Sequence, residues 1–186
     1  RLSYRVGEGT SIMIFWQAPK GVTGTINDLF GGLIVGKELQ GIDSLTVDNH
    51  EGIDILDVTL NYAAPAMPAS PMASADPNGD ILLQWTSGDD QTDGFIIERS
   101  TLGGQFSYVD SLDAETTRYV DTEVSNEESY AYRIVAYNIV GNSDAAMVSF
   151  EPVIVLPPTE CQVTVICPSS VTLNWLGAGI SEEGFR

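Results

Sequence analysis

Short runs of alternating hydrophobic and polar residues fill most of the chain, and Gly, Asn, Asp and Ser separate one run from the next. An alternation with a period of two predicts β-strands that bury one face. The runs between residues 68 and 152 show no helical period. This pattern predicts an all-β fold made of antiparallel strands, arranged as a sandwich of two sheets.

The clearest unit runs from Pro68 to Pro152 and contains seven such runs. It opens with an Asn-Gly turn at residues 76–80, which is typical of a β-hairpin. Three of its runs place large apolar residues on one face, and we expect that face to form the core of the sandwich. The predicted core residues are Ile81, Leu83, Trp85, Phe95, Ile97, Tyr130, Tyr132, Ile134 and Ala136.

Several segments of this unit carry a family resemblance. They are Trp85 in its strand, "DGFIIERS" at 93–100, "YVDTEV" at 119–124 and "SYAYRIVAYNIVGNS" at 129–143. Together they resemble a fibronectin type III domain over residues 64–152. The resemblance implies that Trp85 is a core tryptophan and that Tyr130 is the tyrosine of the corner motif, whose hydroxyl bonds a nearby backbone group. Both roles are structural.

Part of this unit is repeated 90 residues later. The segment Asp80 to Ser100 is echoed by Ser170 to Arg186, so that Trp85 and Phe95 map onto Trp175 and Phe185. Residues 153–186 therefore resemble the N-terminal strands of a second fibronectin type III domain. We expect the chain to be a fragment of a longer protein, in which the missing strands or another chain cover Val171, Leu173 and Trp175.

Residues 1–63 form a separate β-rich region. Two strands are expected around the Gly-Glu-Gly of residues 7–9, with Ile12, Ile14 and Trp16 on one face. "RLSY", "GEG" and "FWQAP" resemble the closing hairpin of the protective-antigen-like (PA-fourteen) β-domain, but the sugar-binding and calcium-binding positions of that family lie outside this match. At least two more strands are expected, with a hairpin turn at 48–52 and a long strand at 53–62.

Charge narrows the classes of partner. The chain has 26 acidic residues against 8 basic ones and a formal charge of −18, which repels phosphate backbones and anionic lipid headgroups. We therefore expect no nucleic-acid binding. No stretch approaches the roughly 18 apolar residues that a membrane span requires, so we expect no membrane insertion.

Acidic loops are the candidate metal sites. Residues 89–94, "DDQTDG", match the start of a calcium loop, but Ser100 stands where the closing Glu belongs. The turns at 76–80 and 48–54 are similarly acidic. We interpret all three as ordinary loops, leave calcium as an open alternative, and assign no metal-binding or cofactor-binding residue.

Catalytic side chains are scarce. His50 is the only histidine and lies in an expected turn, and neither a nucleophile elbow nor a phosphate-binding glycine run occurs. Trp16, Trp85 and Trp175 lie on apolar strand faces, where core packing is favoured over sugar stacking. Cys161 and Cys167 would lie roughly 20 Å apart along a straight strand, so they pair with each other only if the chain bends between them. Buried or partly exposed free thiols, and a disulfide to the missing part of the protein, stay open as alternatives.

These observations predict a non-catalytic piece of a large secreted or cell-surface protein. The leading hypothesis is adhesion, surface-structure assembly or spacing, through contacts with other protein chains, copies of itself or glycans. The alternative is that the modules are accessories of a large extracellular carbohydrate-active enzyme or peptidase, whose catalytic domain lies elsewhere. We assign no catalytic residue and expect no enzyme within the chain.

Overall fold

Strands are the only regular secondary structure in the part of the chain that the computed structural model describes. That part comprises residues 2–6, 11–28, 32, 35–48, 55–101, 103–125, 127–153, 159–167 and 170–176, with the backbone alone at 2–6 and at several positions after 158. Within these ranges there is no helix, and hence none that could span a bilayer. The predicted all-β class is confirmed.

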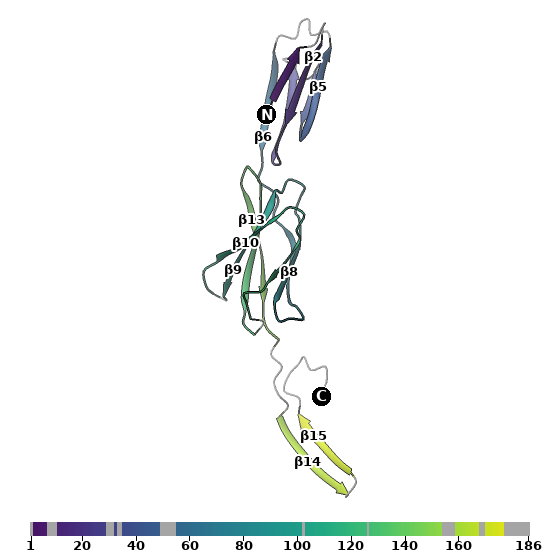
Figure 1. The fold of residues 1–186 in the computed structure, drawn as a ribbon, viewed down its shortest axis with the longest axis vertical. Coiled ribbons are helices and arrows are strands. Elements are labelled where there is room, and N and C mark those ends of the chain that lie inside the picture. Colours follow the sequence, from purple (N-terminus) through teal and green to yellow (C-terminus); the bar gives the residue numbers. More distant parts are fainter. Residues whose placement is uncertain are drawn as a thin grey trace.

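The strands form three groups that follow one another along the long axis of the molecule (Figure 1). The front module contains β1 (Leu2–Val6), β2 (Ser11–Gln17), β3 (Val22–Asp28), β4 (Gly36–Leu39), β5 (Ile42–Asp48) and β6 (Leu56–Tyr62). The middle module contains β7 (Ala69–Ala75), β8 (Ile81–Thr86), β9 (Gly94–Thr101), β10 (Ser107–Asp113), β11 (Arg118–Asp121), β12 (Tyr130–Tyr137) and β13 (Asn142–Phe150). A hairpin of β14 (Thr159–Cys167) and β15 (Ser170–Leu176) comes last.

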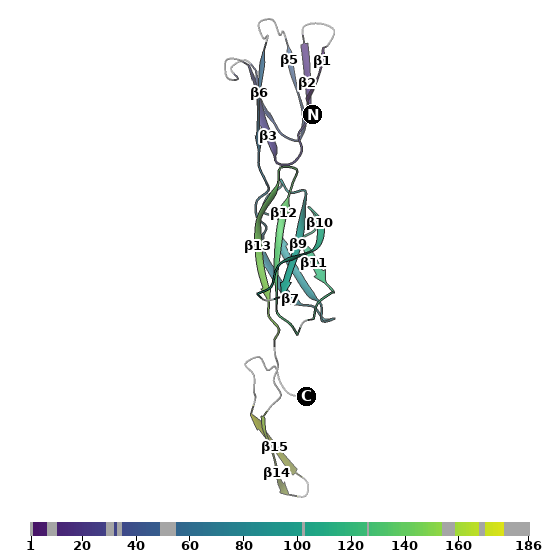
Figure 2. The same cartoon turned by 90° about the vertical axis from the view of Figure 1, so that its left-hand side faces the viewer.

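The middle module is a sandwich of two antiparallel sheets. One sheet has the order β11-β8-β7 and the other β10-β9-β12-β13, the latter seen broadside in Figure 2. The predicted core face is confirmed, because all nine of its residues are buried between the sheets. Trp85 and Phe95 meet edge to face with ring centroids 5.5 Å apart, an arrangement that aromatic quadrupoles favour.

The front module contains two three-stranded sheets, β1-β2-β5 and β4-β3-β6. The predicted apolar face of β2 is confirmed, since Ile14 and Trp16 are buried and Ile12 packs against the same core. Strand β3 was not predicted. Gly24 interrupts its alternation, and a Cβ there would lie 2.1 Å from the carbonyl oxygen of Thr59 on β6, so the close strand pairing requires glycine.

The hairpin turn expected at residues 48–52 is wrong. β5 pairs with β2 and β6 pairs with β3, so the chain crosses between sheets after β5. This topology lets Leu45 of β5 and Leu56 of β6 reach one core from opposite sides, because each strand has an apolar face to bury. Residues 49–54, including His50, lie outside the described part of the chain.

The last hairpin places both cysteines in one strand. β14 runs continuously from Thr159 to Cys167, with two register shifts in its pairing but no reversal, so the bend that would pair Cys161 with Cys167 is absent from the described backbone. The side chains of Val171, Leu173 and Trp175 lie outside the described part of the structure. Their predicted exposure stays a prediction.

Candidate functional site at the junction of the two modules

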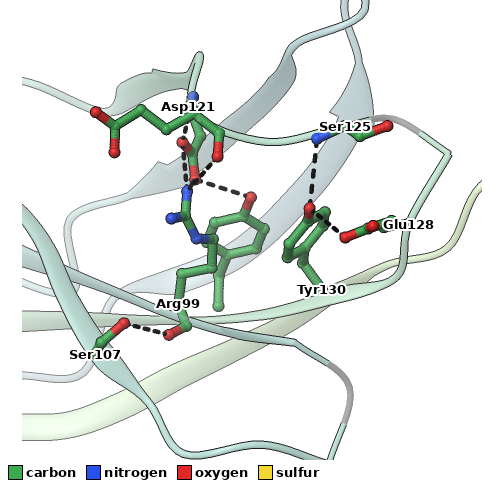
Figure 3. A network of polar contacts seen from close by, with 8 residues as sticks. Arg99, Ser107, Asp121, Ser125, Glu128 and Tyr130 are labelled. Atoms are coloured by element: carbon green, nitrogen blue, oxygen red, sulfur yellow. Dashed lines mark hydrogen bonds and ion pairs between the residues drawn. The ribbon is translucent and has the colours of Figure 1, made fainter.

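A buried ion pair joins the two sheets of the middle module (Figure 3). Arg99 on β9 donates to both carboxylate oxygens of Asp121 on β11, at 2.8 and 2.7 Å. The hydroxyl of Tyr132 on β12 donates to the same carboxylate at 3.1 Å, and the backbone N–H of Glu123 donates to it at 3.2 Å. Asp121 is only 1% exposed, so its charge depends on these donors.

The environment of this ion pair shifts two pKa values upward. Burial, followed by the nearby Asp121 charge, raises the pKa of the Tyr132 phenol far above its usual value. Burial works in the opposite direction on Arg99, but the hydrogen bond and charge of Asp121 outweigh it and raise the pKa of the guanidinium. The Arg99 charge and the neutral Tyr132 phenol are therefore fixed at neutral pH, which suits a structural network rather than acid–base catalysis.

Tyr130 forms the corner that the sequence predicted. Its hydroxyl accepts a hydrogen bond from the backbone N–H of Ser125 at 3.4 Å and donates one to Glu128 Oε2 at 2.9 Å, as Figure 3 shows. The expected bond between this hydroxyl and a backbone group is confirmed. It ties the connection between β11 and β12 to the start of β12.

Asn138 is the central polar residue of the junction between the front and middle modules. Its amide donates to the carbonyl of Ala63, in the segment after β6, at 3.0 Å and to the carbonyl of Gln91 at 3.1 Å. Its side-chain oxygen accepts from the backbone N–H groups of Val140 and Gly141, at 2.8 and 3.2 Å. Asn138 is buried, and its side chain makes four hydrogen bonds, so the buried polar atoms of this side chain all have partners.

The turn between β2 and β3 reaches across to the middle module. Gly21 donates its N–H to Gln91 Oε1 at 3.0 Å and accepts from the N–H of Ala63 at 2.9 Å, while Lys20 Nζ donates to the carbonyl of Thr92. Gly21 has φ +79°, a conformation in which glycine is favoured. A Cβ at this position would lie 2.3 Å from Asn138 Nδ2, so glycine is also required by space.

The acidic loop at 89–94 belongs to this junction. Asp89 Oδ2 accepts from the N–H of Ala66 at 2.7 Å, and Oδ1 accepts from Gln91 N and Thr92 Oγ1 at 3.0 and 3.3 Å. Sequence reasoning expected a solvated loop, but Thr92 is almost fully buried here. Oδ2 of Asp89 thus holds the segment that connects the modules, while Oδ1 orders the loop at 89–94 itself.

The other predicted candidates lie apart from the junction. Asp76 Oδ1 accepts from the N–H groups of Asn78 and Asp80, which closes the predicted Asn-Gly turn. Trp16 and Trp85 are confirmed as core residues. Among the described residues, no group of three or more Asp, Glu, His or Cys gathers in a metal-binding arrangement.

The front module also has an apolar pocket of about 200 Å³. β2, β3, β4 and β6 supply its walls, with Trp16, Val22, Leu39, Val58 and Leu60 among the lining residues. The wall is almost entirely apolar, so it offers no group for acid–base or nucleophilic chemistry.

Sequence reasoning missed the junction because its members are far apart in the chain. Gly21 and Gln91 are separated by 70 residues, and Asn138 and Ala63 by 75. Each is a common loop residue that needs no partner to explain it. The local sequence offers one signal of a fixed junction. The chain has a turn glycine, Gly21, and a short connection at 63–68 that contains prolines.

Comparison with known proteins gives one curated relative and a set of similar folds. No family model matches the chain. It is 33% identical over 132 residues to an amylopullulanase of Thermoanaerobacter thermohydrosulfuricus, a match that covers 70% of this chain and 8% of that protein. The chain thus spans a small part of its relative.

Two solved structures illustrate the structural similarity. A two-domain fibronectin type III segment of chicken tenascin is 13% identical with a TM-score of 0.48, covering 80% of this chain and 96% of that one. An Fn3-like protein from Clostridium thermocellum is 22% identical with a TM-score of 0.43, covering 51% of this chain and all of that one. The resemblance of residues 1–30 to the protective-antigen-like β-domain stays a prediction.

Proposed function

We propose that residues 69–150, which form a fibronectin type III domain, act with the front module as a non-catalytic spacer of fixed geometry. The domain shows the expected sandwich, with three strands facing four and the tyrosine corner at Tyr130. Its buried polar network of Arg99, Asp121 and Tyr132 links the two sheets. A domain of this kind can hold other domains at a set distance, and this role needs no reactive group.

The junction is the observation that carries this proposal. Flexible tandem modules are joined by exposed linkers with few contacts, and their relative motion is the default. Here the connection at 63–68 is bonded at Ala63 and Ala66 by side chains of the middle module, and Pro65 and Pro68 are buried. These contacts oppose bending between the modules.

The carbohydrate-active context is the second part of the proposal. The 33% identity with an amylopullulanase supports an origin in a large carbohydrate-active enzyme, in which this unit is an accessory that positions other domains. Sequence reasoning placed this hypothesis second, behind adhesion, and the relative moves it to first place. Secretion or display on the cell surface belongs to the same proposal.

Adhesion or surface-structure assembly is the second candidate. It is favoured by the exposed apolar side chains along β6, where Val58 and Leu60 are more than two-fifths exposed and Tyr62 is 65% exposed. Exposed apolar strands at the edge of a sheet are sites where another chain can add. Under this candidate the partner is a protein or a second copy, and no catalytic domain is needed.

Capture of the natural protein tests the proposal. Antibodies raised against the chain would isolate the polypeptide from cells and medium of the organism that carries the gene, and peptide mass sequencing would read its other domains. We expect a secreted or surface protein with a carbohydrate-active catalytic domain. A protein made only of repeated modules would support the adhesion candidate and contradict the enzyme context.

A further inference from the structure

A row of side chains crosses the outer face of the four-stranded sheet of the middle module. The strand register places Tyr108 of β10 opposite Glu98 of β9, Glu98 opposite Arg133 of β12, and Arg133 opposite Met147 of β13. Neighbouring strands lie about 4.8 Å apart, so the row is about 14 Å long. We name these four residues, with the adjacent Phe106, the outer platform.

The platform exposes apolar surface that the sandwich does not need. Tyr108 is 63% exposed and Met147 is 58% exposed, so neither contributes to the core. A bulge after Tyr108 shifts the pairing of β10 with β9 between Tyr108 and Asp110. Bulges bend a strand locally and re-aim its side chains, and they are frequent beside binding sites.

Arg133 supplies the polar part of the platform in a fixed position. Its guanidinium carbon lies 3.8 Å from the ring centroid of Phe106, and its Nη1 lies 4.0 Å from Glu98 Oε2. The ring contact holds the guanidinium through a cation–π interaction. Since 4.0 Å is long for a hydrogen bond, Arg133 and Glu98 both retain capacity to bond a ligand.

Charge selects the kind of ligand. Arg133 and Glu98 cancel within the platform, and the chain as a whole carries −18, so polyanions are repelled. A neutral sugar presents an apolar C–H face together with hydroxyl groups that both donate and accept. Such a ligand matches an exposed aromatic ring beside one donor and one acceptor, because a few fixed polar groups orient a ligand held by apolar contact.

We propose that the outer platform binds a neutral polysaccharide. The Tyr108 ring receives the apolar face of a sugar, and Arg133 and Glu98 bond its hydroxyl groups. The proposal deepens the carbohydrate-active context given above and rests on it for the choice of neutral glucans as ligands. It gives the spacer a second role, in which it keeps the parent protein on the polymer.

Affinity electrophoresis through gels that contain pullulan or amylopectin tests the platform. We expect these polysaccharides to retard the chain, and Tyr108→Ala and Arg133→Met to weaken the apparent affinity at least tenfold. Tyr108→Phe keeps the ring and should retain binding. Tyr62→Ala is the matched control, because Tyr62 is equally exposed but lies on the front module. Urea unfolding midpoints check that each variant is folded.

Three results would overturn the platform proposal. The first is a chain that neither polysaccharide retards, and the second is an equal loss in Tyr62→Ala and Tyr108→Ala. The third is a Tyr108→Ala variant that loses self-association in sedimentation without any change in retardation, which would assign this face to a second copy. The antibody capture is independent of all three, so a failed platform and a failed enzyme context are distinguishable.

Discussion

Asp121 and Arg99 show at the scale of single residues how the sandwich tolerates a charge in its interior. The carboxylate is 1% exposed, whereas the Arg99 side chain that faces it is 21% exposed. Asp121 is therefore the partner whose charge water cannot solvate if the ion pair is broken. Removing the guanidinium leaves the buried Asp121 carboxylate without a countercharge. Replacing Arg99, Asp121 and Tyr132 together with apolar residues leaves no buried charge.

We expect Arg99→Met to lower the free energy of unfolding by about 3–5 kcal/mol, the usual cost of breaking a buried pair. The triple variant Arg99→Met, Asp121→Leu, Tyr132→Phe should be more stable than this single variant, because no charge or hydroxyl then lacks a partner. Urea unfolding at pH 7 measures both. A triple variant less stable than Arg99→Met would contradict this reading of the network.

Tyr132 should make the free energy of unfolding decrease at alkaline pH. Its raised pKa means that the folded state keeps the proton, so its contribution is complete below the unfolded pKa of about 10 and is lost as pH rises toward the folded value. Above pH 10 the stability should fall by up to about 1.4 kcal/mol per pH unit for this group. Urea midpoints at pH 8 and pH 11 should differ less in Tyr132→Phe than in the parent chain. Equal differences would exclude Tyr132 as the cause.

Sequence alternation predicted the buried residues better than their polar partners. Trp85 lies two positions from Leu83, and Tyr130 lies two positions from Tyr132, so the shared inward face of each pair follows from strand geometry. The contact between Arg99 and Asp121 does not, because these residues lie 22 positions apart on strands of opposite sheets. Nothing local to either residue names its partner.

At the scale of elements, glycine decides where strands can approach closely. Gly94 begins β9, and a Cβ there would lie 2.4 Å from the carbonyl oxygen of Leu112 and 2.5 Å from the Tyr137 hydroxyl. We expect Gly94→Ala to destabilise the middle module by about 1–3 kcal/mol through overpacking. Gly141→Ala is the control, since no atom lies within 4 Å of its added Cβ, and it should change stability by less than about 0.5 kcal/mol. Thermal unfolding of the two variants checks the difference, and equal losses would contradict it.

The strand predictions were wrong where the local sequence pattern and the tertiary packing favour different structures. Seven strands were predicted for the middle module, and the runs that form β8, β9 and β12 are the clearest, because their apolar residues alternate and turn residues bound them. In the front module β3 lacks that alternation, since Gly24 serves the pairing with β6. The pairing of β5 and β6 was predicted from a competent turn sequence, but burial of both apolar faces required opposite sheets.

At the scale of the whole molecule, the junction sets the relative position of the two modules. Gly21→Ala would push a methyl group into Asn138 and strain a backbone at φ +79°. We expect the loss of one or two hydrogen bonds of about 1 kcal/mol each, which would open the connection at 63–68. Cleavage there by proteinase K should be about tenfold faster, corresponding to about 1.4 kcal/mol.

The matched control for that variant is Gly41→Ala. Gly41 also has a positive φ, +55°, but its added Cβ would meet no atom within 4 Å. It therefore reproduces backbone strain at the same module without touching the junction. Equal acceleration of cleavage in both variants would show that strain, not the contact with Asn138, controls the connection.

Residual dipolar couplings of backbone N–H groups test the fixed geometry most directly. If Asn138, Gly21 and their partners hold the modules together, one alignment tensor fits the couplings of residues 11–48 and 69–150 in the unmodified chain. Two tensors of different magnitude for the two modules would show independent motion and contradict the account of a spacer with a fixed junction.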